Sequence, residues 1–124
     1  MKVYGGFSLI ELMIVLTIIG VLVGVALPSY SRNVQEGNRV DAQQQLLQFA
    51  SILERNYTRA GSYPAEDSFS LDPSEYYEFK YTRSSDTAFT LTAAPKGSQA
   101  SDMCGDMTIN QQGLTTASLD NCWR

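Results

Sequence analysis

The sequence contains no histidine, and this absence removes the most common general base and the most common ligand of transition metals. It also lacks a cluster of basic residues, since nine Lys and Arg stand against thirteen Asp and Glu in the 124-residue chain. Proteins that follow the phosphate backbone of nucleic acid need such a cluster, so nucleic acid is not the expected partner. We predict no catalytic residue, no metal site and no cofactor.

Cysteine is scarce as well, because Cys104 and Cys122 are the two that the chain has. Both follow an apolar segment that is long enough to enter a membrane, and a domain downstream of such a segment is expected in an oxidising compartment. We therefore predict a disulfide between them. It would close a loop of about 17 residues and stabilise the domain by on the order of 3 kcal/mol in the chain-entropy model.

One long apolar run is present near the N-terminus, and between residues 7 and 27 its one charge is Glu11. A helix of about 21 residues is roughly 30 Å long, which is enough to span a membrane. A secretory signal has its small-residue cleavage site after the apolar run, whereas here paired glycines precede it. Cleavage at Gly6 would keep the span on the mature protein, and Lys2 weakly marks the cytoplasmic side.

The residues around Glu11 resemble the signal of a known family. From Gly6 to Met13 the chain reads GFSLIELM, which is similar, position for position, to the class III signal of type IV pilins and type II secretion pseudopilins. The resemblance implies that a prepilin peptidase removes residues 1–6 as a leader by cutting after Gly6. It also implies that the same enzyme methylates the new N-terminus, Phe7.

Glu11 needs a partner, because an ionised carboxylate in lipid costs on the order of a few kcal/mol. Lys2 leaves with the leader and Arg32 lies far along the helix, so the candidate cation is the α-amine freed at Phe7, in the same chain or in a neighbour. The resemblance favours the neighbour and implies that Glu11 directs subunit assembly. The alternative is an interfacial carboxylate that the helix dipole favours.

The apolar helix is expected to be weak between Gly20 and Pro28. Gly20 and Gly24 form a G-x-x-x-G pair that allows close helix packing, and Pro28 removes a helical hydrogen bond. This weakness is either a static kink or, as the resemblance implies, a segment that extends when subunits pack into a filament. We expect residues 7–28 to span the membrane and later to form the filament core.

Residues 29–60 continue the helix in amphipathic form, because apolar residues recur there at intervals of three and four. Gly61 is a natural cap with Pro64 beyond it, so the helix should end near Ala60. The apolar stripe comprises Leu46, Phe49, Ala50, Leu53 and Tyr57. The glutamines Gln43, Gln44 and Gln48 lie mostly off this stripe. The charged residues assigned to a solvated face are Arg32, Glu36, Arg39 and Asp41.

Residues 61–74 are rich in turn formers and are predicted to form a loop, the αβ-loop by resemblance. Residues 75–124 are predicted to form an antiparallel sheet of about four strands whose apolar face covers the helix stripe. Its inward residues are Tyr77, Phe79 and Tyr81, then Phe89, Leu91 and Ala93, then Met107 and Ile109, before a short polar segment at 114–119. By resemblance the disulfide bounds the pilin D-region, and Asp102 and Asp106 are assigned to the surface.

The predicted fold is therefore α+β, a pilin fold with one long N-terminal helix packed on an antiparallel sheet. The resemblance implies a minor pilin of the PilE type that supports pilus biogenesis, twitching motility, attachment or DNA uptake. Its expected partners are other pilins, the prepilin peptidase, the inner-membrane assembly machinery and, before assembly, lipid. The expected location is the inner membrane with the C-terminal domain in the periplasm, and afterwards the pilus on the cell surface.

Other classes remain open at this stage. A type II secretion pseudopilin shares the whole N-terminal signal, but by resemblance its major forms carry a calcium loop in place of the disulfide. A major pilin is a further alternative, although the chain is short for one. A membrane-tethered receptor would leave the GFSLIELM signal unexplained, and an enzyme is disfavoured because no nucleophile motif organises the serines and carboxylates.

Overall fold

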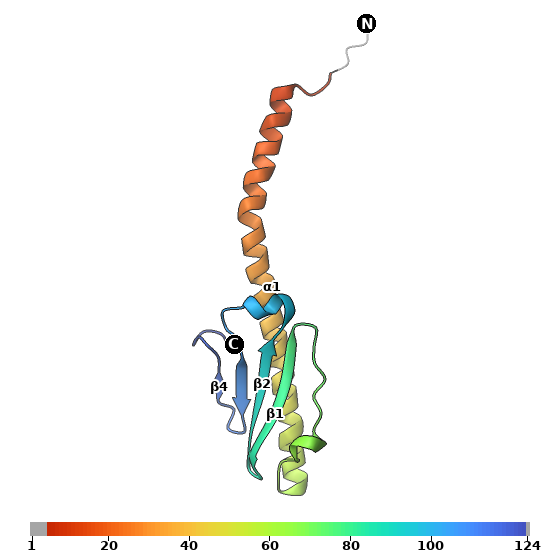
Figure 1. The fold of residues 1–124 in the computed structure, drawn as a ribbon, viewed down its shortest axis with the longest axis vertical. Helices are drawn as coiled ribbons and strands as arrows, with labels where there is room; N and C mark the ends of the chain where they lie inside the picture. The colour runs from red at the N-terminus through yellow and green to blue at the C-terminus, as the bar shows by residue number, and fades with distance from the viewer. Residues whose placement is uncertain (1–4, 124) are drawn as a thin grey trace. The chain divides into compact units, whose positions relative to one another are not determined.

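The computed structural model describes residues 5–123, so the predicted role of Lys2 lies outside the described residues. One helix, α1 (Leu9–Ala60), precedes all of the strands (Figure 1). The elements after it are η1 (Glu66–Ser68), β1 (Tyr77–Ser85), β2 (Ala88–Pro95), η2 (Gly97–Ser101), β3 (Met107–Asn110) and β4 (Thr115–Thr116). The predicted α+β fold, with one long helix and a four-stranded antiparallel sheet, is confirmed.

The chain divides into two compact units, residues 1–34 and residues 35–124. In the described part of the first unit the backbone is helical from Leu9 on, and every side chain up to Val34 is exposed. An 18-residue window of α1 has a mean hydropathy of 2.7, which is apolar enough to cross a membrane. The Thr17 hydroxyl donates to the Met13 carbonyl at 2.8 Å, so this polar group is satisfied inside the helix.

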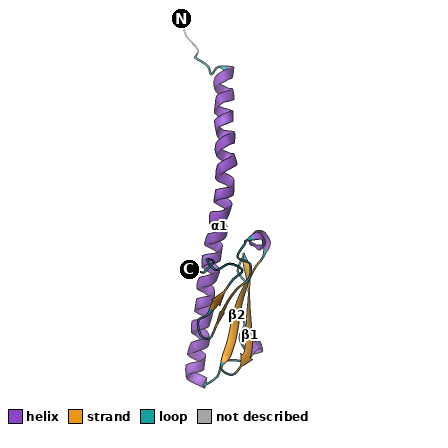
Figure 2. Cartoon of the chain, turned by 90° about the vertical axis from the view of Figure 1, so that its left-hand side faces the viewer, coloured by secondary structure: helices purple, strands orange, loops and turns teal. Residues whose placement is uncertain are grey.

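The second unit places the sheet against residues 42–57 of α1 (Figure 2). The strands follow the order β1-β2-β3-β4, and Tyr81, Leu91 and Ile109 are paired in register across the first three. Phe49 of α1 meets Phe79 of β1 edge to face, with ring centroids 5.3 Å apart. The buried core comprises Ala42, Leu46, Leu53, Tyr63, Tyr77, Tyr81, Phe89, Leu91, Ala93, Met107 and Ile109. The alternating inward residues of β2 and β3 are thereby confirmed.

Each edge of this sheet makes contacts with other groups of its own chain. At the β4 edge the Trp123 indole N–H donates to the Thr116 carbonyl at 2.9 Å. Within the sheet, the hydroxyls of Thr108 on β3 and Thr116 on β4 are hydrogen bonded to each other. At the β1 edge Glu66 accepts the Arg83 amide at 2.7 Å. A strand of two residues that is capped by an indole offers little free backbone to a second sheet.

Arg39 and Asp102 were predicted wrongly as solvated or surface groups, and Gln43, predicted to lie mostly off the apolar stripe, is buried as well. Arg39 and Asp102 form a mostly buried ion pair, and Gln43 is fully buried beside the disulfide. The physical reason is the same for all three, because each finds a buried partner more than sixty positions away in the sequence. A paired polar group can be buried at a small net cost, whereas an unpaired one cannot.

The backbone at Gly105 gives a first testable prediction. Gly105 has φ +57°, and a Cβ added there would lie 2.9 Å from Ser118 Oγ. Gly105→Ala is therefore expected to cost about 1–2 kcal/mol of unfolding free energy, through both left-handed backbone strain and crowding. Gly113→Ala is the matched control, since Gly113 has φ +78° but open space around it. Equal losses by urea denaturation would show that the Ser118 contact plays no part.

Candidate assembly and processing site

The signal residues lie at the start of α1 in an exposed, non-helical segment. Residues 5–8 carry no helix, and the Phe7 side chain is 89% exposed. A Cβ added at Gly6 would meet no atom of the described chain within 4 Å. The bond between Gly6 and Phe7 is therefore exposed and outside the helix, and the space around Gly6 does not itself require glycine there. Cleavage at this bond stays a prediction.

Ser8 and Glu11 form a reciprocal cap at this helix end. The Ser8 amide donates to Glu11 Oε2 at 3.0 Å, and the Glu11 amide donates to Ser8 Oγ at 3.2 Å. This is a capping box, which satisfies two backbone donors that a helix start leaves unpaired. The predictions missed it, although serine followed three residues later by glutamate is its sequence signature. Glu11 is thus bound to its own backbone in the single chain.

The capping box leaves Glu11 able to take a further partner. An ionised carboxylate offers about four acceptor positions, and the Ser8 amide uses one of them. The bond also directs the carboxylate toward the N-terminal side of the helix, where the amine of a mature pilin N-terminus would be found. The predicted pairing of Glu11 with an α-amine stays a prediction that this geometry accommodates.

The predicted weak segment of α1 has an open surface. The structure is helical through Gly20, Gly24 and Pro28, and a Cβ added at either glycine would meet no neighbour within 4 Å. The structure of the single chain thus presents these glycines for packing by another helix. Extension of this segment in a filament stays a prediction.

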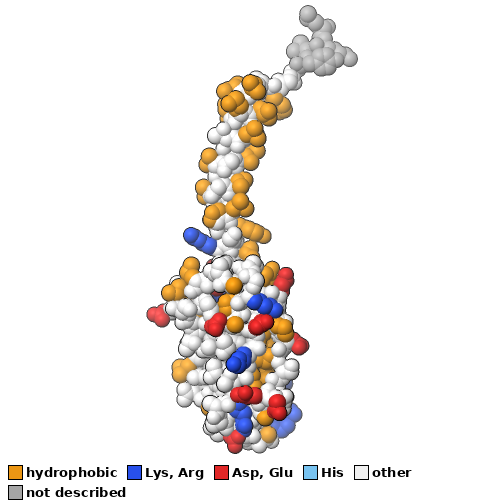
Figure 3. Space-filling view, in the orientation of Figure 1, with side chains coloured by type: hydrophobic (Ala, Val, Ile, Leu, Met, Phe, Trp, Pro, Cys, Tyr) orange, Lys and Arg blue, Asp and Glu red, His pale blue; other side chains and the backbone are white. Residues whose placement is uncertain are grey.

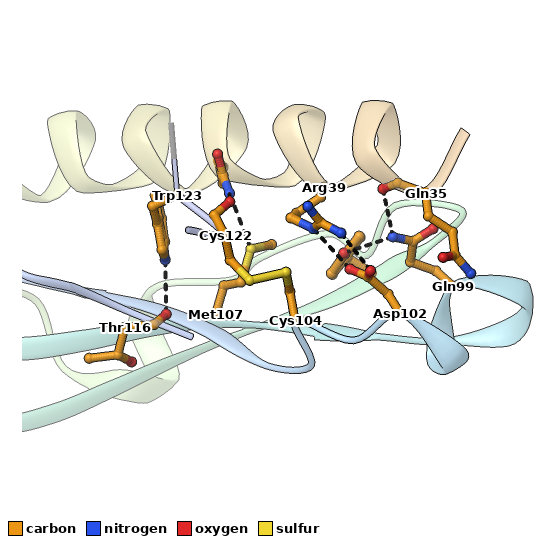
Figure 4. Close-up of a disulfide and its surroundings, with 11 residues drawn as sticks. Gln35, Arg39, Gln99, Asp102, Cys104, Met107, Thr116, Cys122 and Trp123 are labelled. Atoms are coloured by element: carbon orange, nitrogen blue, oxygen red, sulfur yellow. Dashed lines mark hydrogen bonds and ion pairs between the residues drawn. A yellow bond between two sulfur atoms is a disulfide. The ribbon is translucent and has the colours of Figure 1, made fainter. Parts of the chain in front are cut away.

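The predicted disulfide is present near the C-terminus and is confirmed. Cys104 and Cys122 are bonded, with their Cα atoms 5.9 Å apart (Figure 4). Next to it, the Arg39 guanidinium binds the Asp102 carboxylate through two hydrogen bonds of 2.6 and 3.0 Å. The hydrogen bond to Asp102 raises the pKa of Arg39 above its ordinary value, so this cation stays charged.

Removing the disulfide is expected to weaken the domain without unfolding it at room temperature. The double variant Cys104→Ser/Cys122→Ser loses a cross-link over 18 positions, worth on the order of 3 kcal/mol. Urea unfolding of the full chain in detergent micelles should show this loss. Wild-type protein treated with dithiothreitol should reach the same stability, and the double variant should not respond to the reagent. A double variant as stable as the oxidised wild type would contradict the expectation.

The surface charge of the second unit is mixed rather than clustered. In the face that Figure 3 shows, basic and acidic side chains are interspersed over this unit. Two of the cations are also engaged in ion pairs, Arg39 with Asp102 and Arg83 with Asp86. Within residues 5–123 no group of three Asp, Glu or Cys side chains is placed to hold a metal ion.

The helix start, the sheet and the C-terminal disulfide together define a pilin-like subunit. Residues 28–108 match the family described as type IV minor pilin ComP, DNA uptake sequence receptor, and residues 1–27 match the prokaryotic N-terminal methylation motif. The chain belongs to this family of type IV minor pilins, as the resemblance implied. Such proteins are structural subunits, so the chain is not an enzyme, and membership implies packing with other pilins and processing by a prepilin peptidase.

The solved structures that are similar to this chain include two pilins. A type IV pilin from Shewanella oneidensis is 42% identical, with a TM-score of 0.66 over 73% of this chain and 98% of that one. The non-core minor pilin PilV of Neisseria meningitidis is 23% identical, with a TM-score of 0.59 over 72% of this chain and 91% of that one, and it supports the fold alone. A search of curated proteins gave no significant match.

Proposed function

We propose that the chain is a minor subunit of a type IV pilus that is cut between Gly6 and Phe7 and inserted into the filament through α1. The observation that carries this proposal is the exposure of the apolar side chains from Phe7 to Leu27 around the helix. Such a surface is unfavourable in water, so lipid or other apolar helices must cover it. A pilin exchanges the first covering for the second.

Glu11 is the assembly residue in this proposal. Its carboxylate pairs with the N-methylated α-amine of Phe7 in a neighbouring subunit, while the capping bond from the Ser8 amide keeps it at the helix end. An ion pair between subunits removes the cost of a charge in an apolar filament core. Gly20, Gly24 and Pro28 mark the segment whose helix loosens during packing.

The proposed location follows from the same parts of the chain. Residues 7–28 anchor the subunit in the inner membrane, and residues 29–124 lie in the periplasm until assembly. The disulfide supports this orientation, because structural disulfides persist in oxidising compartments and are rare in the cytoplasm. The inner-membrane assembly machinery is the expected partner at that stage.

Mass spectrometry of sheared surface filaments, compared with the membrane fraction, tests the proposal. We expect a chain that begins at N-methylated Phe7, with its cysteines bonded, at a low ratio to another pilin. The same mature chain confined to the membrane of a cell that secretes folded proteins would favour a type II secretion pseudopilin. A chain that keeps Met1 in every fraction would overturn the proposed processing.

A role in DNA uptake is the second candidate, and the description of the matched family favours it. The mixed surface charge and the net charge of −4 favour an indirect role, in which the pilus rather than this domain binds DNA. We expect the full chain in detergent micelles not to shift duplex DNA at about 0.15 M salt in a mobility assay. A shift that weakens steeply with added salt would assign the DNA contact to this chain.

A further inference from the structure

Two residues one turn apart on α1 each hold one end of the disulfide loop. Arg39 binds Asp102, which lies two positions before Cys104, and it makes both hydrogen bonds of a bidentate pair. The two side chains are 14% and 1% exposed, so solvent screens this ion pair little. The first end of the loop is thereby fixed to the helix.

Gln43 holds the other end. Its side-chain amide donates to the Cys122 carbonyl at 2.6 Å and lies 3.4 Å from Met107 Sδ. Gln43 is 2% exposed, and a buried amide donor of this kind is costly to leave without its acceptor. Since positions i and i+4 lie on the same face of a helix, Arg39 and Gln43 make these contacts from one face of α1. Figure 4 shows the pair of Arg39 and Asp102 next to the disulfide.

The segment that leads into Asp102 is anchored to the same helix. The Gln99 side-chain amide donates to the Gln35 carbonyl at 2.9 Å and to the Tyr77 hydroxyl at 3.1 Å, and Gln99 accepts from Asn38 at 3.2 Å. Every polar group of this buried side chain is thus used. Turn η2 is therefore seated on α1 by contacts that do not involve either cysteine.

We propose that Arg39 and Gln43 are positioning residues for closure of the Cys104–Cys122 bond. They seat the two loop ends on α1 while the thiols are still free, and so raise the effective concentration of one thiol at the other. In the closing step each sulfur loses a proton, an S–S bond forms, and two electrons pass to a disulfide-bearing oxidant, whose own S–S bond is reduced to two thiols. The oxidant can be a thiol oxidase or oxidised glutathione.

A merely structural role would give a different result from a positioning role. Contacts that only stabilise the folded chain lower its melting temperature when removed and leave the thiol and disulfide equilibrium of the folded chain unchanged. Contacts that hold the loop ends in place are thermodynamically coupled to the disulfide. If the disulfide strengthens these contacts by a given factor, removing them shifts the equilibrium between free thiols and disulfide by the same factor. The redox equilibrium is therefore the readout that separates the two.

The experiment equilibrates the full chain in detergent micelles with reduced and oxidised glutathione and measures the fraction that is bonded. Arg39→Met and Gln43→Leu are expected to lower the effective thiol concentration by about tenfold each, whereas Arg39→Lys, which keeps the charge, should recover part of it. The matched controls are Arg55→Met and Gln44→Leu, both at exposed positions of α1, and these should stay within about twofold of wild type.

Circular dichroism of the reduced proteins confirms that each compared variant is folded. Should reduced Arg39→Met unfold, Asp102→Asn, which keeps the size of the side chain and removes the ion pair, takes its place with the same expected loss. An equilibrium within about twofold of wild type for folded Arg39→Met or Asp102→Asn, and for Gln43→Leu, would overturn the proposal. It would assign these residues to fold stability alone.

Discussion

Replacing Gly6 by leucine is expected to leave the whole population of the chain in the inner membrane as uncleaved precursor. Apart from the two neighbouring residues, no atom of the described chain lies within 4 Å of a Cβ at this position, so we expect the substitution to leave the helix start and the capping box in place. The effect falls on the peptidase, which must approach the backbone beside the bond that it cuts. Immunoblotting of membrane fractions should show one band at the precursor mass and none in sheared filaments.

Gly5→Leu is the matched control for this experiment. Gly5 also has open space around it and lies in the same non-helical segment, one residue further from the bond. Cleavage should therefore be reduced much less than in Gly6→Leu. Normal cleavage of Gly6→Leu would remove the argument that the chain is processed at this bond, and equal loss in both variants would show that the site tolerates no bulk on its leader side.

Replacing Glu11 by glutamine is expected to permit cleavage and to lower incorporation into filaments at least about tenfold. Glutamine keeps the acceptor oxygen that the Ser8 amide needs, and it is an accepted residue in a capping box. It loses the negative charge, so a neighbour's α-amine would be left without its counter-ion in an apolar filament core. The ratio of this chain to the other pilins in sheared filaments measures the effect.

The variant Ser8→Ala tests the helix-capping role of Glu11 separately from the role of its negative charge. It removes the hydroxyl that accepts the Glu11 amide at 3.2 Å and keeps the carboxylate, so it should cost roughly 1 kcal/mol of local helix stability and reduce incorporation only partly. If Glu11→Gln instead assembles normally while Ser8→Ala does not, the role of Glu11 is to cap the helix. The proposed ion pair between subunits would then be wrong.

The parts of the fold that depend on the periodicity of apolar residues and on helix-ending residues could be predicted from the sequence. Gly61 ends α1 at Ala60, and the alternation of β2 buries Phe89, Leu91 and Ala93 on one face. These signals are local, because a cap or a strand face depends on residues within a few positions. The disulfide could be predicted equally well, since the chain has two cysteines and therefore one possible pairing.

The polar contacts beside the disulfide could not be predicted. On a helical wheel Arg39 and Gln43 lie off the apolar stripe, like ordinary polar residues. They are buried because Asp102 and Cys122, which are distant in the sequence, pack against them. No periodicity encodes which distant carboxylate a given arginine meets. The capping box is a different case, because Ser8 and Glu11 are three positions apart, and the pattern was present in the signal that identified the family.

The contacts at the edges of the sheet have a consequence for how subunits are stored. In the proposed location, subunits share one membrane before assembly, and open sheet edges there would favour pairing between domains and β-aggregation. Here the β4 edge is short and closed by Trp123, and Glu66 engages the β1 edge at Arg83. We therefore expect neighbouring domains to resist pairing through their sheets, so that contacts between subunits fall mainly on the exposed apolar side chains of residues 7–27.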